Sequence, residues 1–289
     1  VAGHSAQGQW RAAARARQVQ HDVSDLAGLV DLKSALLLAR VPVEVDVRSS
    51  AIGIDSAAAR ELLGLESSQV GSLADVAGAL DRLPPRDRPF TTTDVDDLAE
   101  QAGRGSTPAV LDGFDELDAR TDRVWEQRLL ELRYEIVELG DRDLAAQLAD
   151  LENAAIVGGT TTSLITGLAE YWFPGPTSPA LGEARVSLGI TRARLDRALA
   201  LLASSPDRDI ARAGAGLERR RDGAFGTAVT VALAEVRPPT VDVAEAAATF
   251  RSAFGLFGPI LGIVESLSSG LEASADRSAN ESTRLARQT

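Results

Sequence analysis

The sequence predicts an all-α fold in which antiparallel helices form one or two bundles, with the longest helices first and last. Alanine, leucine and arginine dominate the 289 residues, and aromatic residues make up only 4%, a composition that favours helices over sheets. Apolar residues recur at helical spacing along the chain, and no segment alternates apolar and polar residues as a half-buried strand does. We expect one helical region over 1–289, built as a single bundle or as two stacked bundles that share helices 6–49 and 241–289.

Apolar stripes and capping residues mark the helices of the first half. Leu29, Leu36 and Val43 form one stripe of a long helix, and Asp55 and Thr91 are placed to cap later helices. The expected helices are 6–49, 55–63, 72–83 and 91–105, with a proline-rich turn at 84–89.

Prolines and glycines divide the second half in the same way. A helix that starts at Pro108 carries an apolar stripe with Phe114 and Trp125, and Gly140 ends it. Further helices are expected at 142–172, 181–202, 207–236 and 241–289, with breaks at 173–179, 204–207 and 237–239.

Two prolines fall inside segments that otherwise read as good helices. Pro42 lies in the first long helix and Pro259 in the last, and each removes a backbone hydrogen bond and kinks the axis. These kinks either fit the two helices around an irregular core or act as pivots that relay ligand binding.

Several classes of function are disfavoured by what the sequence lacks. The absence of cysteine excludes disulfides and thiolate chemistry, and His4 and His21 are too few for a histidine-based active site or metal site. A net charge of −12 argues against binding to nucleic acid. We expect no catalytic residue, no metal and no other cofactor.

No segment is expected to span a membrane. The most apolar run, 254–267, is shorter than the ~20 apolar residues that a span needs, and it contains Glu265. Methionine is absent even at position 1, so we expect a segment of a longer precursor, with any membrane anchor in the flanking segments.

Arginines on core-facing stripes are the first candidate binding residues. Arg40 lies on the apolar stripe of the first helix, Arg128 lies one turn from two apolar residues of its helix, and Arg192 flanks a leucine stripe. The planar guanidinium suits carboxylates and oxyanions, so together the three could bind a small anion between helices. Alternatively, Arg40 pairs with Glu44 one turn later, and the others join an internal ion-pair network with the 42 acidic residues.

The stretch "VGGTTTSLITGLAEYW" at 157–172 is the second candidate. It places small and hydroxylated residues, with Thr161 among them, ahead of the aromatic Trp172. The hydroxyls could line a pocket that the aromatic ring covers, or the small side chains could simply permit close helix packing.

The run "LVDLKSALLLARVPVEVDVRSSAIGIDSAAARELLGL" at 29–65 resembles the opening of extracytoplasmic sensor regions in actinobacterial membrane receptors, many of them diguanylate cyclases. The long entry and exit helices are similar to those of the nitrate- and nitrite-sensing paired four-helix bundles. This resemblance implies an all-helical ligand sensor, attached to a membrane protein through both ends and dimeric. It also implies that bundle arginines hold the anion, with Arg40 as the matching position here.

The expected function is therefore a non-enzymatic, extracytoplasmic sensor domain of a transmembrane receptor. We expect a small ligand, with an anion favoured, and a homodimer, with membrane contact only through flanking segments. The alternative is a structural or protein-interaction bundle without a small ligand. It would use for its partner either the apolar face Phe250–Phe257 or the glycine flank of the last helix, formed by Gly255, Gly258 and Gly262.

Overall fold

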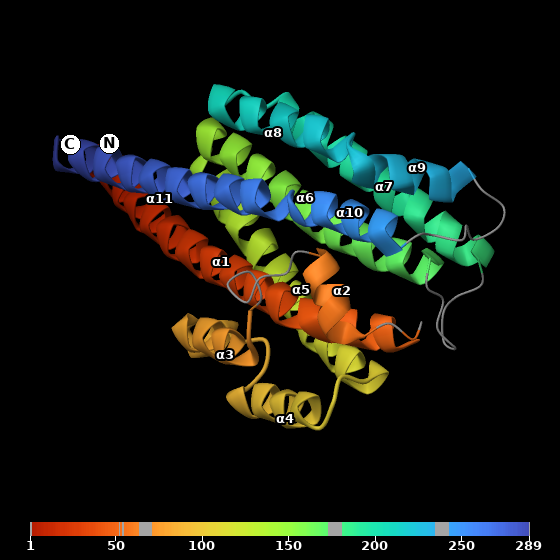
Figure 1. Cartoon of the computed structure of the whole chain (residues 1–289). Coiled ribbons are helices and arrows are strands. Elements are labelled where there is room, and N and C mark those ends of the chain that lie inside the picture. The colour runs from red at the N-terminus through yellow and green to blue at the C-terminus, as the bar shows by residue number, and fades with distance from the viewer. Residues whose placement is uncertain are drawn as a thin grey trace.

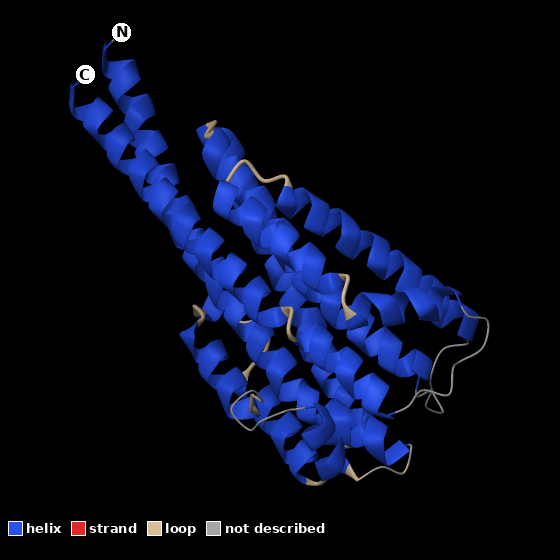
Figure 2. Cartoon of the chain, turned by 45° about the horizontal axis from the view of Figure 1, so that its top comes forward, coloured by secondary structure: helices blue, strands red, loops and turns tan. Residues whose placement is uncertain are grey.

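The computed structural model describes residues 2–51, 53, 55–63, 71–172, 181–234 and 243–288. All regular structure in these ranges is helical, which confirms the predicted all-α bundle (Figure 2). In chain order the helices are α1 (Ala2–Ala51), α2 (Ser56–Leu63), α3 (Leu73–Arg82), the 3-10 turn η1 (Pro85–Asp87), α4 (Thr92–Gly103), α5 (Pro108–Leu139), α6 (Arg142–Trp172), α7 (Leu181–Ala203), α8 (Arg208–Arg221), α9 (Ala224–Ala234), α10 (Val243–Phe254) and α11 (Phe257–Gln288).

The first and last helices run side by side in opposite directions, so that both chain ends emerge together (Figure 1). At about 1.5 Å per residue, the 50 residues of α1 extend over roughly 75 Å. Small residues such as Ala16 and Ala279 are buried where α1 and α11 meet, and the Arg17 guanidinium donates to the Thr283 hydroxyl at 3.3 Å. Beyond the other helices, α1 and α11 continue as a two-helix stalk (Figure 2).

Helix starts follow the predicted capping residues. The Asp55 carboxylate accepts from the Ala58 N–H at 3.0 Å, which caps α2. Thr91 forms a capping box with Asp94 at the start of α4, and Ser72 forms the same motif with Asp75 at the start of α3. The predicted loop 173–179 and the predicted stop 237–239 lie outside the described residues.

The single helix predicted at 207–236 is wrong, because the chain breaks between α8 and α9. Two poor helix formers lie at or next to the break: Gly223 in the break itself and Gly226 in the first turn of α9. A Cβ at Gly226 would come within 2.2 Å of the Arg221 carbonyl oxygen, so this tight turn admits only glycine.

Pro42 lies inside α1 without ending the helix, and the carbonyl that it leaves free finds a partner from another segment. In an unbroken helix, residue 42 would donate to the carbonyl of Leu38. Here the N–H of Gly71 donates to that carbonyl at 3.2 Å. The approach is close, because a Cβ at Gly71 would lie 2.8 Å from the Cβ of Leu38. The proline therefore fixes where the chain before α3 packs on α1.

Pro259 has the same effect in the last helix, one turn before its own position. It cannot donate to the Gly255 carbonyl, and the helix predicted from 241 is interrupted at Gly255 and Leu256, between α10 and α11. The Arg220 guanidinium of α8 donates to the Gly255 carbonyl at 3.5 Å. The predicted interruption by proline is confirmed, and Pro259 itself lies in the first turn of α11.

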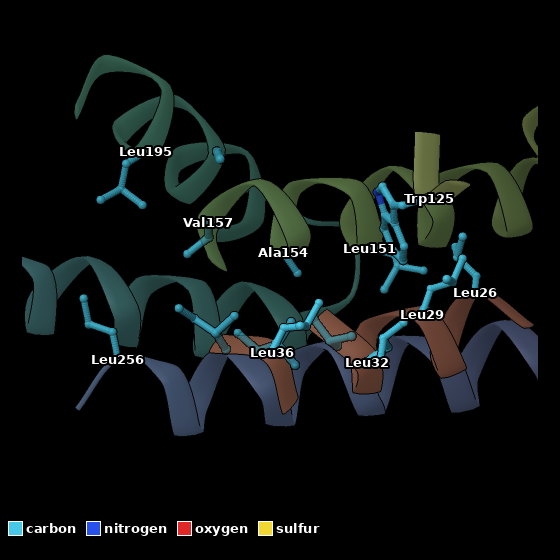
Figure 3. Packing of buried hydrophobic residues seen from close by; sticks show 14 of the residues in the cluster. Leu26, Leu29, Leu32, Leu36, Trp125, Leu151, Ala154, Val157, Leu195 and Leu256 are labelled. Atoms are coloured by element: carbon cyan, nitrogen blue, oxygen red, sulfur yellow. The ribbon is translucent and has the colours of Figure 1, made fainter. Parts of the chain in front are cut away.

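One continuous set of buried apolar residues, from Val19 to Ala275, fills the space between the helices. Figure 3 shows the leucines Leu26–Leu36 of α1 on one side of this core, opposite Ala154 and Val157 of α6. Trp125 of α5 and Leu256, which precedes α11, contribute to the same core (Figure 3).

Within the described residues, one helical stretch, Ala244–Gln288, is long and apolar enough to cross a membrane by length and composition. This finding differs from the expectation that no segment is long and apolar enough to span a membrane. Several apolar residues of α11, with Ile263, Val264 and Leu267 among them, are buried in the bundle, whereas Leu261 is exposed. Core helices of folded domains pass the same test.

Candidate functional site

A cavity of about 370 Å³, partly open to solvent, lies between the helices of the bundle. Five helices line it: α1, α5, α6, α7 and α11. Its apolar lining includes Leu36, Phe114, Trp125, Ile260 and Val264. Such a cavity, mostly apolar with a few polar groups, is the typical form of a small-molecule site.

Arg40 is the predicted arginine that lines the cavity, and its guanidinium is already engaged. Its Nε donates to Glu44 at 3.1 Å, and its Nη1 contacts the Asp115 carboxylate of α5. Burial of the guanidinium lowers its pKa, but the two carboxylates outweigh this effect and the pKa lies above its ordinary value. Arg40 is therefore a charged cation held by protein carboxylates.

A third carboxylate faces the cavity between two ion pairs. Arg40 contacts Asp115, and Lys33 contacts Asp122. Asp118 lies on α5 between these two pairs and lines the cavity. Its carboxylate has no ion-pair or hydrogen-bond partner among the described residues. The α1–α5 contact thus brings three carboxylates to two cations.

Arg128 lies outside this cavity, in a polar cluster between α1, η1 and α5. Its guanidinium contacts Asp87, which is fully buried, and Glu131 one turn along α5. The neighbouring Arg86 donates to Asp25 of α1 at 2.9 Å. The cluster is an internal ion-pair network of the kind considered as the alternative for Arg128.

Asp22 of α1 completes this cluster. Burial raises its pKa, whereas a hydrogen bond from Gln18 and the charges of Arg128 and Arg86 act in the opposite direction. The cluster contains more carboxylates than cations, and protonation of Asp22 would reduce that excess.

Arg192 is not brought near Arg40. It lies on α7, where its guanidinium donates to the Thr230 hydroxyl of α9 at 2.6 Å and lies 3.7 Å from Asp196. The three predicted arginines therefore occupy three separate places, and one of them lines the cavity.

The small, hydroxylated segment of α6 contributes to the cavity, but not through Thr161. Thr160, Thr162 and Ser163 line the cavity, while Thr161 is fully buried elsewhere. The hydroxyl of Thr161 has no hydrogen-bond partner among the described residues, whereas the Thr160 hydroxyl donates to the Ile156 carbonyl at 2.5 Å. Both alternatives for this segment hold in part, since some of its side chains line the cavity and others are packed in the core.

Trp172 lies at the end of α6, away from the cavity lining. Its ring packs edge-on against Phe250 of α10, with centroids 5.7 Å apart and planes at 73°. It acts as a core residue in the described part of the chain.

Asp118 is not among the binding residues predicted from the sequence. A usable signal was present, because Asp118 lies at helical spacing between Phe114 and Trp125, on the apolar stripe of its helix. The same reasoning that selected Arg40 on an apolar stripe would have selected this carboxylate. Its neighbours from α6 and α11 could not be assigned without the fold.

No group of three or more histidine or acidic side chains among the described residues is arranged to hold a metal ion. In comparisons with known proteins, no family model, no curated protein and no solved structure matches this chain.

Proposed function

We propose that this chain is a ligand-sensing helical domain, in which a small molecule in the cavity changes the position of α1 relative to α11. The observation that carries the proposal is the lining of the cavity by both of these helices, which then run side by side to the chain ends (Figure 1). A ligand between them would contact both of the helices that continue into the stalk.

The prolines support this proposal, because each lies beside cavity-lining residues. Arg40 precedes Pro42 by two positions, and Phe257 and Ile260 flank Pro259. At both places the helix lacks one internal hydrogen bond, so bending there costs less than in an intact helix. A bound ligand shifts the stalk only if it binds one arrangement more tightly than the other.

The resemblance of residues 29–65 extends the proposal to an extracytoplasmic domain of a membrane receptor without catalytic activity of its own. The adjacent ends of α1 and α11 suit attachment to two neighbouring segments of such a receptor. The cavity volume of about 370 Å³ lies within the range that is usual for small-molecule sites.

Distance measurements on the stalk would test the relay. The chain has no cysteine, so Arg11→Cys with Arg284→Cys gives two unique spin-label sites on exposed residues of α1 and α11. Probes would be nitrate, nitrite, acetate and primary amines, followed by a fragment library, each screened first by thermal shift. We expect a stabilising ligand to change the label-to-label distance measured by pulsed electron paramagnetic resonance.

A cavity-filling variant gives the matched control. Gly159 of α6 lines the cavity and has no heavy atom within 4 Å of an added Cβ, so Gly159→Leu should fill space without a clash. Gly216→Leu places the same side chain in the middle of helix α8, at a position that does not line the cavity. Gly159→Leu should abolish both binding and the distance change, and Gly216→Leu should preserve them. A ligand that binds without changing the stalk distance, or the absence of any ligand sensitive to Gly159→Leu, would contradict the proposal.

A second candidate function, a protein-interaction bundle, rests on a different surface. Leu130, Tyr134 and Val137 form an apolar stripe on α5 and are 61%, 65% and 69% exposed. A stripe of this kind on a folded domain is typical of a protein contact, including contact with a second copy. Sedimentation velocity would test it: Tyr134→Glu should lower the association state if the stripe forms a dimer contact.

A further inference from the structure

Asp118 lines the cavity without a direct ion-pair partner among the described residues. The carboxylates of Asp115 and Asp122 are each in contact with a cation of α1, and Asp118 lies between them without such a partner among the described residues. Like charges at this helical spacing are unfavourable. An additional cation in the cavity would relieve the repulsion.

Apolar and aromatic side chains line the same cavity as this carboxylate. Phe114 and Trp125 lie on the same stripe of α5 as Asp118, and all three line the cavity. Leu36 of α1 and Ile260 of α11 add aliphatic surface. An ammonium group beside a carboxylate and aromatic rings gains from both the ion pair and the attraction of a cation to a ring face.

Partial burial disfavours the charged form of Asp118. It raises the pKa of Asp118 above its ordinary value. The carboxylates of Asp122 and Asp115 add to this increase, and the cations of Lys33 and Arg40 oppose it. An ionisable side chain in a cavity whose pKa is shifted by burial and by charged neighbours is a candidate binding residue.

We propose that the cavity takes an amphipathic organic cation, whose ammonium group pairs with Asp118 and whose apolar body lies against Phe114, Trp125 and the aliphatic lining. This inference rests on the proposed sensing function and names the class of its ligand. It also replaces the anion that the arginine pattern favours, because Arg40 and Lys33 are already paired with protein carboxylates.

An anion would have to compete with protein carboxylates for two of the three cavity cations, Arg40 and Lys33. Arg40 is held by Glu44 and Asp115, and Lys33 is held by Asp122. Arg194, an exposed residue of α7, is the cavity-lining cation for which no carboxylate partner is found among the described residues. A tail carboxylate on the ligand would meet Arg194, so this residue separates the two classes of ligand experimentally.

Calorimetric titration of the full chain with three matched probes tests the proposal. The probes are 4-phenylbutylamine, 4-phenylbutanol and 4-phenylbutanoate, which share an apolar body and differ in charge. We expect the amine to bind at least about tenfold more tightly than the alcohol, and the carboxylate to bind most weakly. Asp118→Asn should remove the preference of the amine over the alcohol.

Two variants serve as controls. Asp112→Asn removes an exposed carboxylate of the same helix, outside the cavity, and should leave amine binding unchanged. Arg194→Gln should also leave amine binding unchanged, but it should weaken any binding of the carboxylate. Thermal unfolding of each variant shows that it is folded before titration.

The outcomes separate this inference from the proposed function. Equal affinities for amine and alcohol, or amine binding that survives Asp118→Asn, would overturn the cationic ligand. If the carboxylate binds best, loses affinity with Arg194→Gln and is blocked by Gly159→Leu, the cavity remains the sensing site and only its ligand class is wrong. If Gly159→Leu affects none of the three probes or any library ligand, the sensing site itself is refuted.

Discussion

Replacing Gly71 by alanine should loosen the contact that stabilises α1 beside its internal proline. The added Cβ would lie 2.8 Å from the Cβ of Leu38 and 3.2 Å from the backbone N of Ala39. Overpacking of this kind costs about 1–3 kcal/mol. The displaced N–H would also leave the Leu38 carbonyl without its donor, which adds about 1 kcal/mol. We expect Gly71→Ala to lower the free energy of unfolding by about 2–4 kcal/mol.

A double-mutant cycle with Pro42→Ala isolates the hydrogen-bond part of this loss. Alanine at position 42 restores the helical N–H that donates to the Leu38 carbonyl, so this carbonyl no longer depends on Gly71. Gly71→Ala should then cost about 1 kcal/mol less in the Pro42→Ala background than in the natural sequence.

Urea unfolding followed by circular dichroism measures all four proteins of the cycle. Gly78→Ala is the matched control, because an added Cβ there meets only the end of Arg82 at 3.9 Å. This control lies inside α3 and should stabilise the protein by up to about 1 kcal/mol. A Gly71→Ala variant as stable as the natural protein, or strictly additive effects in the cycle, would refute the reasoning.

Three further predictions concern polar groups in the interior. Asp118→Asn should raise the free energy of unfolding by about 1 kcal/mol at pH 7, because it removes a partly buried charge without a direct partner. Burial raises the pKa of Asp118 in the folded protein, so this gain in stability should decline as the pH falls through that pKa. The gain should vanish once Asp118 is protonated in both the folded and the unfolded protein. Urea unfolding at several pH values measures this dependence. Thr161→Val should stabilise the protein by about 1 kcal/mol, because it removes a buried hydroxyl without a hydrogen-bond partner among the described residues. Thr160→Val removes a hydrogen-bonded hydroxyl and should not stabilise the protein. A lower melting temperature for Thr161→Val than for the natural protein would contradict this prediction. Asp87→Asn should destabilise the protein by about 3 kcal/mol in the same assay, because it leaves the buried side of Arg128 without its carboxylate, and a change below about 0.5 kcal/mol would contradict the role of this pair.

Arg40 and its carboxylate partners show what the residue spacing within a single helix can and cannot predict. The arginine on the stripe of α1 was identified from spacing alone, and it does line the cavity. The choice of ligand class depended on what the guanidinium contacts, and one of its carboxylates, Asp115, comes from α5. Spacing within α1 reveals Glu44 as a partner but cannot reveal a side chain on another helix.

The sequence by itself determined most of the helices, several of their caps and the two places where proline removes a hydrogen bond, but not the break between α8 and α9. These follow from interactions between residues a few positions apart, and such interactions act in any tertiary context. The tertiary structure alone decided which donors meet the carbonyls freed by proline, which charges cancel, and where space remains between helices. Those outcomes depend on segments that are distant along the chain, as the pairing of Gly71 with Leu38 and the isolation of Asp118 illustrate.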